Sequence, residues 1–507
     1  MKRITAIALV MLVLVASLFA GGSKESSQTP AAKDSLTVAL SSEPRSLDPF
    51  GSNDSNSTNI KLQVYDTLLY IDTDASIKPN LAEKFEWVNG NTLQVTIRKD
   101  VKFHNGDLLK ASDVLYTLQH SQESEYTTWI VEGVNFDKTV CDDEAGTVSI
   151  VLNEPSGSLP ARLCQLIVVS KSYTENNPKI LESAPMGTGP FLFDKWVKGD
   201  SLTFKANKDY WKGAPAYNTL ILRSITESAT RTIEIKSGNV DVALSVIESD
   251  VESLSKNPDV KVLRKPGSSN TWIGFNCTAA PFDNQKVRQA ICYAIDKKAI
   301  VDAVYSGIGS VATGPIPPSV WGYTADVPDY SYNPEKAKQL LAEAGYANGL
   351  TVEIKTSNSQ VRVDIAEIVQ QFLKEVGITV KISTLENATY LTDIVNMNVQ
   401  MFILGWETTT LDADYGLYEP YHSGMPTWSN TTGFSDPEVD KLLDEARSCI
   451  DMDQRRELYR QAQIAIVECA PAAFLWDKED IVVTSSHLDG VTMNGSGRIN
   501  FYSATFN

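Results

Sequence analysis

Between residues 333 and 446 the sequence alternates regularly between helix and strand signals. Asn333 can cap a helix that has Pro334 in its first position, and Gly345 ends the apolar periodicity that follows. The next signals are a strand at 350–355, a helix that stops at Gly377, strands at 378–382 and 401–404, and a helix opened by Pro437. Strands that alternate with helices predict an α/β lobe.

The first half of the chain has shorter alternating segments, which predict strands at 36–40, 93–97, 148–152 and 201–204. Asn105 and Gly106 predict a tight turn. A chain of 507 residues is too long for one hydrophobic core, so we expect two or three lobes.

Residues 1–20 have the pattern of a secretory signal peptide: Lys2 and Arg3, an apolar run, and small residues near Ala20. Residues 21–35 are rich in small and polar side chains and predict a flexible tether. We therefore expect a periplasmic or extracytoplasmic location. An uncleaved, membrane-tethering leader is the alternative, because Leu18 occupies a position where a small residue is preferred.

The formal net charge is −18, from 63 acidic and 45 basic residues. This excess disfavours a nucleic-acid partner, because phosphate binding needs basic patches. The six cysteines form no CxxC pair, which disfavours a metal cluster or thioredoxin-like chemistry. Export would permit disulfides, but a domain of this size does not need them, so we expect buried free thiols.

Motifs that carry catalysis or bind cofactors are missing from the sequence. The four histidines are not at metal-ligand spacing, and neither a GxSxG elbow nor a GxxxxGK[ST] loop occurs. We expect a protein that is not an enzyme, with no cofactor and no bound metal.

Six segments, in order along residues 36–507, resemble the family 5 bacterial extracellular solute-binding proteins, which serve peptide, nickel and glutathione importers. The segments are LAEKFEW at 81–87 with RKDVKFHNGD at 98–107 and ASDV at 111–114, GTGPF at 187–191 with NKDYW at 207–211, SGNVD at 237–241, PFDN at 281–284 with VRQAI at 287–291, YNPEKA at 332–337, and GW at 405–406 with DADY at 412–415. The last segment is closest to the glutathione- and dipeptide-binding branch.

The resemblance implies an α/β clamshell of two lobes, of the class II periplasmic-binding-protein type, with an additional inserted α/β domain. We expect lobe I at 36–66, 190–272 and 476–507, the inserted domain at 67–189, and lobe II at 273–475. The lobes would close around a peptide-like ligand, and the permease subunits of an ABC transporter would receive it from a monomeric binding protein.

The resemblance also implies binding residues in the stretch after Gly405. An aspartate there receives the α-ammonium of the peptide in peptide-binding relatives, so we predict this role for Asp412, with Asp414 as second choice, beside Trp406 and Tyr415. The alternative is that the two carboxylates cap the turn or the next helix.

Four further residues complete the predicted site. Asn53 and Ser55 lie in a loop that touches the ligand in relatives, Arg362 suits a carboxylate, and Trp272 lies either in the core or over the ligand. Within this fold a nickel chelate, an oligosaccharide or an opine-like solute remains open. A chaperone-like or adhesive surface protein is a further alternative.

Overall fold

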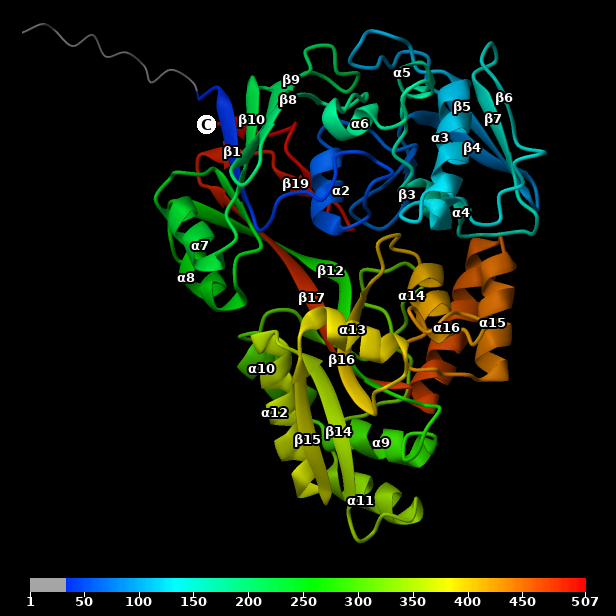
Figure 1. The fold of residues 1–507 in the computed structure, drawn as a ribbon, viewed down its shortest axis with the longest axis vertical. Coiled ribbons are helices and arrows are strands. Elements are labelled where there is room, and N and C mark those ends of the chain that lie inside the picture. Colours follow the sequence, from blue (N-terminus) through cyan, green and yellow to red (C-terminus); the bar gives the residue numbers. More distant parts are fainter. Residues whose placement is uncertain (1–32) are drawn as a thin grey trace, which may run out of the picture.

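The computed structural model describes residues 33–507 and contains one mixed sheet that extends through both halves of the molecule (Figure 1). Its strands are β1 (Ser35–Leu40), β8 (Phe191–Val197), β9 (Ser201–Ala206), β10 (Thr219–Ser224), β11 (Val242–Leu244), β12 (Val260–Phe275), β13 (Ser310–Val311), β14 (Leu350–Ser357), β15 (Ile378–Leu385), β16 (Met401–Glu407) and β17 (Ala472–Ser485). Their order is β15-β14-β16-β12-β17-β11-β1-β10-β9-β8, with β13 beside β17.

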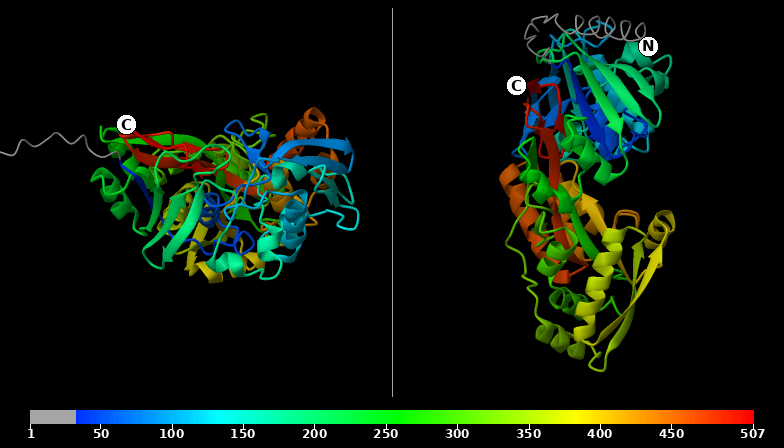
Figure 2. Two further views of the ribbon diagram at one scale, coloured as in Figure 1. Left: turned by 90° about the horizontal axis from the view of Figure 1, so that it is seen from above. Right: turned by 90° about the vertical axis from the view of Figure 1, so that its left-hand side faces the viewer.

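Two long antiparallel strands, β12 and β17, connect the two halves, and we call them the crossover strands. β17 pairs with β11 at one end, whereas β12 pairs with β16 at the other. Figure 1 and the right panel of Figure 2 show both strands running from one lobe to the other. Their register shifts between Pro266 and Asn270, which interrupts the ladder between the lobes. Our predicted boundaries at 272 and 476 fall inside these strands.

Lobe I contains β1 and β8–β11 together with α2 (Ser55–Lys61), α7 (Ser228–Lys236) and α8 (Val251–Ser255). Leu36, Val38, Phe191 and Phe204 are fully buried in its core. Burial of such large apolar side chains stabilises the lobe by about 1.5–3 kcal/mol each.

Lobe II contains β14–β16 and the helices around them. These helices are α9 (Gln285–Ala294), α10 (Lys297–Val304), α11 (Pro334–Glu343), α12 (Gln360–Glu375), α13 (Asn387–Val395), α14 (Ala413–Tyr421), α15 (Pro437–Ser448) and α16 (Met452–Cys469). α12 buries Ile365, Val369 and Leu373, which recur at helical spacing, against the parallel pair β14 and β15.

A small domain projects from lobe I and has its own four-stranded antiparallel sheet, in the order β4-β5-β7-β6. Its elements are β2 (Leu69–Ile71), β3 (Ile77–Pro79), β4 (Ala82–Asn89), β5 (Thr92–Ile97), α3 (Ala111–Glu123), β6 (Val140–Asp142), β7 (Thr147–Val151) and α4 (Leu159–Leu163). Figure 1 shows this domain above α14–α16 of lobe II.

The local signals of the sequence are confirmed. The side chain of Asn333 accepts a hydrogen bond from the Lys336 amide and caps α11, which begins at Pro334. Gly106 has φ +93°, in the predicted turn.

All six cysteines are free, as expected, with Cys164 and Cys292 buried and the other four half-buried. The predicted leader and nearly all of the predicted tether lie outside the described residues. In residues 33–507 the structure contains no helix with the length and apolar character needed to cross a membrane.

Candidate functional site

A cavity of about 540 Å³ lies where the two lobes meet the crossover strands, and we call it the hinge cavity. Lobe I contributes Ser55, Asn59 and residues 244–248, and lobe II contributes Glu407. Residues 268–269 and 478–482 of the crossover strands complete it, together with residues 496–499 of the C-terminal segment. Because both lobes and their connection form the walls, a rotation of one lobe would change the shape of this cavity.

Glu407 links the lobes across the hinge cavity. It is the last residue of β16, and both of its carboxylate oxygens lie 2.8 Å from the hydroxyl of Ser55. Ser55 is the first residue of α2, which Asp54 caps by accepting a hydrogen bond from the Ser57 amide. The cap fixes the start of the helix and therefore the position of the Ser55 hydroxyl.

The charged residues around the hinge cavity are four acids and two bases: Glu248, Glu407, Glu479, Asp480, Lys478 and Arg498. Glu479 pairs with Arg264 at 2.6 Å, and Asp480 pairs with Lys478 at 2.8 Å. The side chain of Glu407 accepts hydrogen bonds from Ser55 alone among the described residues. The hinge cavity thus favours a ligand with a positive end.

Asp412 is bound by an arginine of lobe II and does not line the hinge cavity. Its two carboxylate oxygens accept hydrogen bonds from the guanidinium of Arg455 at 2.7 and 2.6 Å. Asp412 is 5% exposed and Arg455 is fully buried. Asp412 also caps α14 by accepting a hydrogen bond from the Asp414 amide, which was our alternative interpretation.

Asp414 is held in the same way by Arg447, at 3.0 and 3.1 Å, and by the hydroxyl of Tyr459 at 3.0 Å. Burial alone would raise the pKa of Asp414, but the charges of Arg447, Arg455 and Arg162 lower it to about 2. Both aspartates therefore hold α14 against α15 and α16. We do not propose either one as a direct ligand contact.

Trp406 and Tyr415 form an aromatic group where lobe II meets the small domain. The indole nitrogen of Trp406 donates to the carbonyl of Tyr415 at 3.1 Å, and the two ring centroids are 5.5 Å apart. Tyr415 also packs on Trp129 of the small domain, with ring centroids 5.1 Å apart. Beside this contact, Gln165 of the small domain donates to the Thr409 carbonyl at 3.0 Å.

The remaining predicted residues do not line the hinge cavity. Asn53 is exposed two residues before Ser55. Arg362, in the first turn of α12, donates to the hydroxyl of Ser357 at 3.2 Å. Trp272 is 2% exposed and packs edge-to-face on Phe402, so it belongs to the core rather than to a lid over the ligand.

Ser55 is thus the predicted site residue that the structure places on the cavity wall, and Glu407 is the acid that sequence reasoning missed. The sequence feature that could have indicated Glu407 is its position directly after Trp406, at the end of a strand. Among residues 33–507 no group of three or more His, Cys, Asp or Glu side chains is placed to hold a metal ion.

A sheet that continues from one lobe into the other through two long strands, with a polar cavity at the crossing, defines a two-lobed binding protein. Comparison with known proteins gives the family. Residues 76–427 match the sequence profile described as bacterial extracellular solute-binding proteins, family 5. The chain belongs to this family, which confirms both the resemblance and the predicted clamshell.

Three proteins illustrate the relationship. The chain is 33% identical to heme-binding protein A of Haemophilus influenzae, over 81% of this chain and 80% of that protein. It is 30% identical to the glutathione-binding protein GsiB of Pectobacterium atrosepticum, over 91% of each. The ABC transporter-associated periplasmic binding protein DppA of Helicobacter pylori, solved with the peptide STSA, superposes with a TM-score of 0.78 at 27% identity, covering 93% of this chain and 98% of DppA.

Proposed function

We propose that this solute-binding protein captures a small peptide-like ligand, a di- or oligopeptide or a glutathione-like molecule, and delivers it to an ABC permease. The relatives named for glutathione and solved with a peptide support this ligand class. The observation that carries the proposal is the carboxylate of Glu407, which faces a cavity between the lobes and is unpaired with any base among the described residues.

The chemistry of a peptide fits this arrangement. A peptide has an α-ammonium group at one end, and burying that group requires an anionic partner and several hydrogen bonds. Glu407 supplies the charge, and Ser55 supplies a hydroxyl that already lies within hydrogen-bond distance of it. A volume of about 540 Å³ lies in the usual range for small-molecule sites.

The ligand would couple the two lobes. Ser55 belongs to lobe I and Glu407 to lobe II, so a ligand that contacts both residues stabilises the closed arrangement over an open one. The permease would then distinguish the loaded protein by its closed shape. An extracytoplasmic location, a monomeric state and the absence of catalysis belong to the same proposal.

Titration calorimetry with a dipeptide, a tripeptide and glutathione tests the ligand class, and Glu407→Gln tests the site. Each peptide is paired with its N-acetylated form, which lacks the ammonium group. We expect Glu407→Gln to lower the affinity for the free peptide at least about tenfold, or about 1.4 kcal/mol. The affinity for the acetylated peptide, which is lower in the wild type, should not change.

Glu438→Gln, an exposed residue at the start of α15, is the control and should bind like the wild type. Equal affinity of wild type and Glu407→Gln for the free peptide would assign the ammonium to another residue. Absence of heat with all three ligands would refute the ligand class itself.

A further inference from the structure

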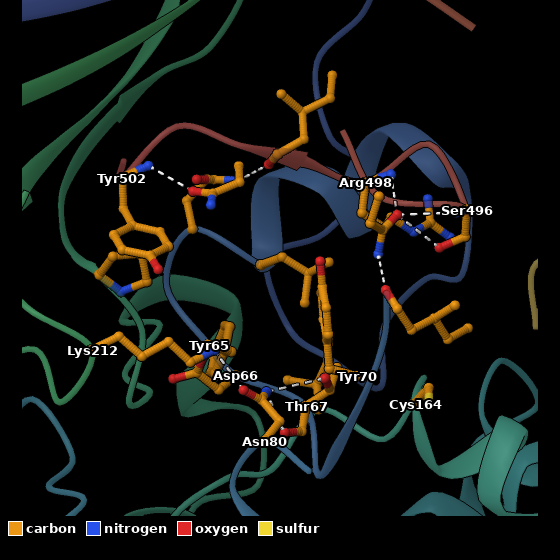
Figure 3. Close-up of a pocket in the computed structure, with 18 of the residues that line it drawn as sticks. Tyr65, Asp66, Thr67, Tyr70, Asn80, Cys164, Lys212, Ser496, Arg498 and Tyr502 are labelled. Atoms are coloured by element: carbon orange, nitrogen blue, oxygen red, sulfur yellow. Dashed lines mark hydrogen bonds and ion pairs between the residues drawn. The ribbon is translucent and has the colours of Figure 1, made fainter. Parts of the chain in front are cut away.

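Lobe I and the small domain enclose a second cavity, of about 440 Å³, which we call the lobe I cavity (Figure 3). Its walls are the end of α2, the β2–β3 hairpin, residues 210–212 and the C-terminal segment from Thr492 to Tyr502. No residue of lobe II lines it. The two cavities share Met493, Ser496, Arg498 and Ile499, so this stretch of chain separates them.

The charge of the lobe I cavity is opposite to that of the hinge cavity. Its charged residues are three bases, Arg98, Lys212 and Arg498, and one acid, Asp66. Asp66 accepts hydrogen bonds from Thr188, Tyr210 and Trp211 at 3.0–3.1 Å and lies 3.8 Å from Lys212. Arg98 pairs with Asp100, outside the cavity wall, at 3.1 Å. The bases still exceed the acids on the wall, with Arg498 making no ion pair among the described residues. A basic cavity in a chain with a net charge of −18 favours an anionic ligand.

Two of these bases have hydrogen-bonding capacity left. Arg498 is 8% exposed, and its Nε has no partner among the described residues, although its Nη1 donates to the Ser55 carbonyl at 3.3 Å. Buried donors without partners are uncommon in folded proteins and point to a missing acceptor. Lys212 donates to the side chain of Asn80 at 2.5 Å and lies 3.8 Å from the Asp66 carboxylate, so at least one of its three protons remains for a ligand.

Aromatic rings form much of the remaining wall. Tyr70, Trp211 and Tyr502 line the cavity, and Tyr70 is 36% exposed. Figure 3 shows Tyr502 and Lys212 on one side of the cavity and Arg498 on the other. Arg98 and Lys212 lie over the Trp211 ring, 4.7 and 4.6 Å from its centroid, and such rings offer edges as well as flat faces to another ring.

From these observations we infer that the lobe I cavity binds a small aromatic carboxylate, with its ring among the three aromatic side chains and its carboxylate toward the bases. Because lobe II is not part of the wall, this binding does not depend on lobe closure. It is also independent of the peptide site proposed above.

Calorimetry of the full chain with 4-hydroxybenzoate tests this inference, with 4-hydroxybenzamide as a neutral ligand of nearly equal size. We expect saturable binding of the carboxylate and at least about tenfold weaker binding of the amide. Lys212→Gln should reduce carboxylate affinity about tenfold, and Tyr70→Ala should reduce the affinity for both ligands. Lys208→Gln, which alters an exposed lysine that bonds Asn218, is the control.

The inference is overturned if the wild type shows no saturable binding at millimolar concentration. It is equally overturned if the carboxylate binds with unchanged affinity to both Lys212→Gln and Tyr70→Ala. Peptide titrations on the same samples separate the two proposals, because neither variant alters the hinge cavity.

Discussion

Replacing Asp412 by Asn should destabilise the protein. The guanidinium of Arg455 is fully buried, and Asp412 provides the two short hydrogen bonds that neutralise it. Breaking a buried ion pair on one side costs about 3–5 kcal/mol. Asn still caps a helix well, so the loss of unfolding free energy comes from the ion pair and not from the cap of α14. Since Asp414 also lies near Arg455 and compensates part of its charge, we expect a loss of about 3 kcal/mol in unfolding free energy.

Urea unfolding followed by tryptophan fluorescence measures this loss. Asp326→Asn is the matched control, because Asp326 forms a 2.6 Å ion pair with Arg460 but is 77% exposed, and its replacement should leave the midpoint unchanged. If both variants unfold at the wild-type urea concentration, the buried pair does not stabilise the fold. A loss of peptide affinity in Asp412→Asn at full stability would return Asp412 to the ligand site.

Glu419, Gly309 and Trp129 provide three further tests. Burial raises the pKa of Glu419 to about 7, so the folded state keeps a proton that the unfolded state loses above about pH 4.5. The unfolding free energy should therefore fall by about 3 kcal/mol as pH rises from about 4.5 to 7. Denaturation of Glu419→Gln at several pH values should show a weaker dependence of the unfolding free energy on pH. Gly309 has φ +84°, and an added Cβ would lie 2.2 Å from the indole nitrogen of Trp476. Gly309→Ala should lower the thermal midpoint more than Gly199→Ala, which has φ +78° but no atom within 4 Å, and equal midpoints would contradict the clash. Trp129→Ala removes the ring contact with Tyr415 and should loosen the small domain from lobe II. The radius of gyration in X-ray scattering should then rise, and an unchanged radius would contradict this role of Trp129.

The sequence predicted most elements of lobe II because their signals are local. The cap at Asn333, the proline that follows it and the apolar spacing act within a few residues, and α11 begins where they indicate. The two strands that cross between the lobes could not be predicted from local sequence. No local pattern shows that β12 continues past its register shift into the second lobe, because this depends on pairing with β17, two hundred residues later in the chain.

The surroundings of the predicted site residues could not be derived from the sequence, because they depend on contacts between distant segments. The partners of Asp412 and Asp414 are Arg455 and Arg447, which lie 43 and 33 residues away on other helices. Spacing around the aspartates therefore could not distinguish a ligand site from an internal ion pair. Glu407 was missed because the apolar run ends at Leu404, although β16 continues for three more residues.

The place of β17 in the sheet determines when lobe I can be completed during synthesis. β1, near the start, pairs with β11, and β11 pairs in turn with β17, so Val38 and Thr484 are joined through a single strand. A ribosome that releases residues in order exposes β1 long before its sheet can be completed. Lobe I can therefore complete its sheet only after residues 482–484 have been translated, and until then the β11 edge lacks its β17 partner.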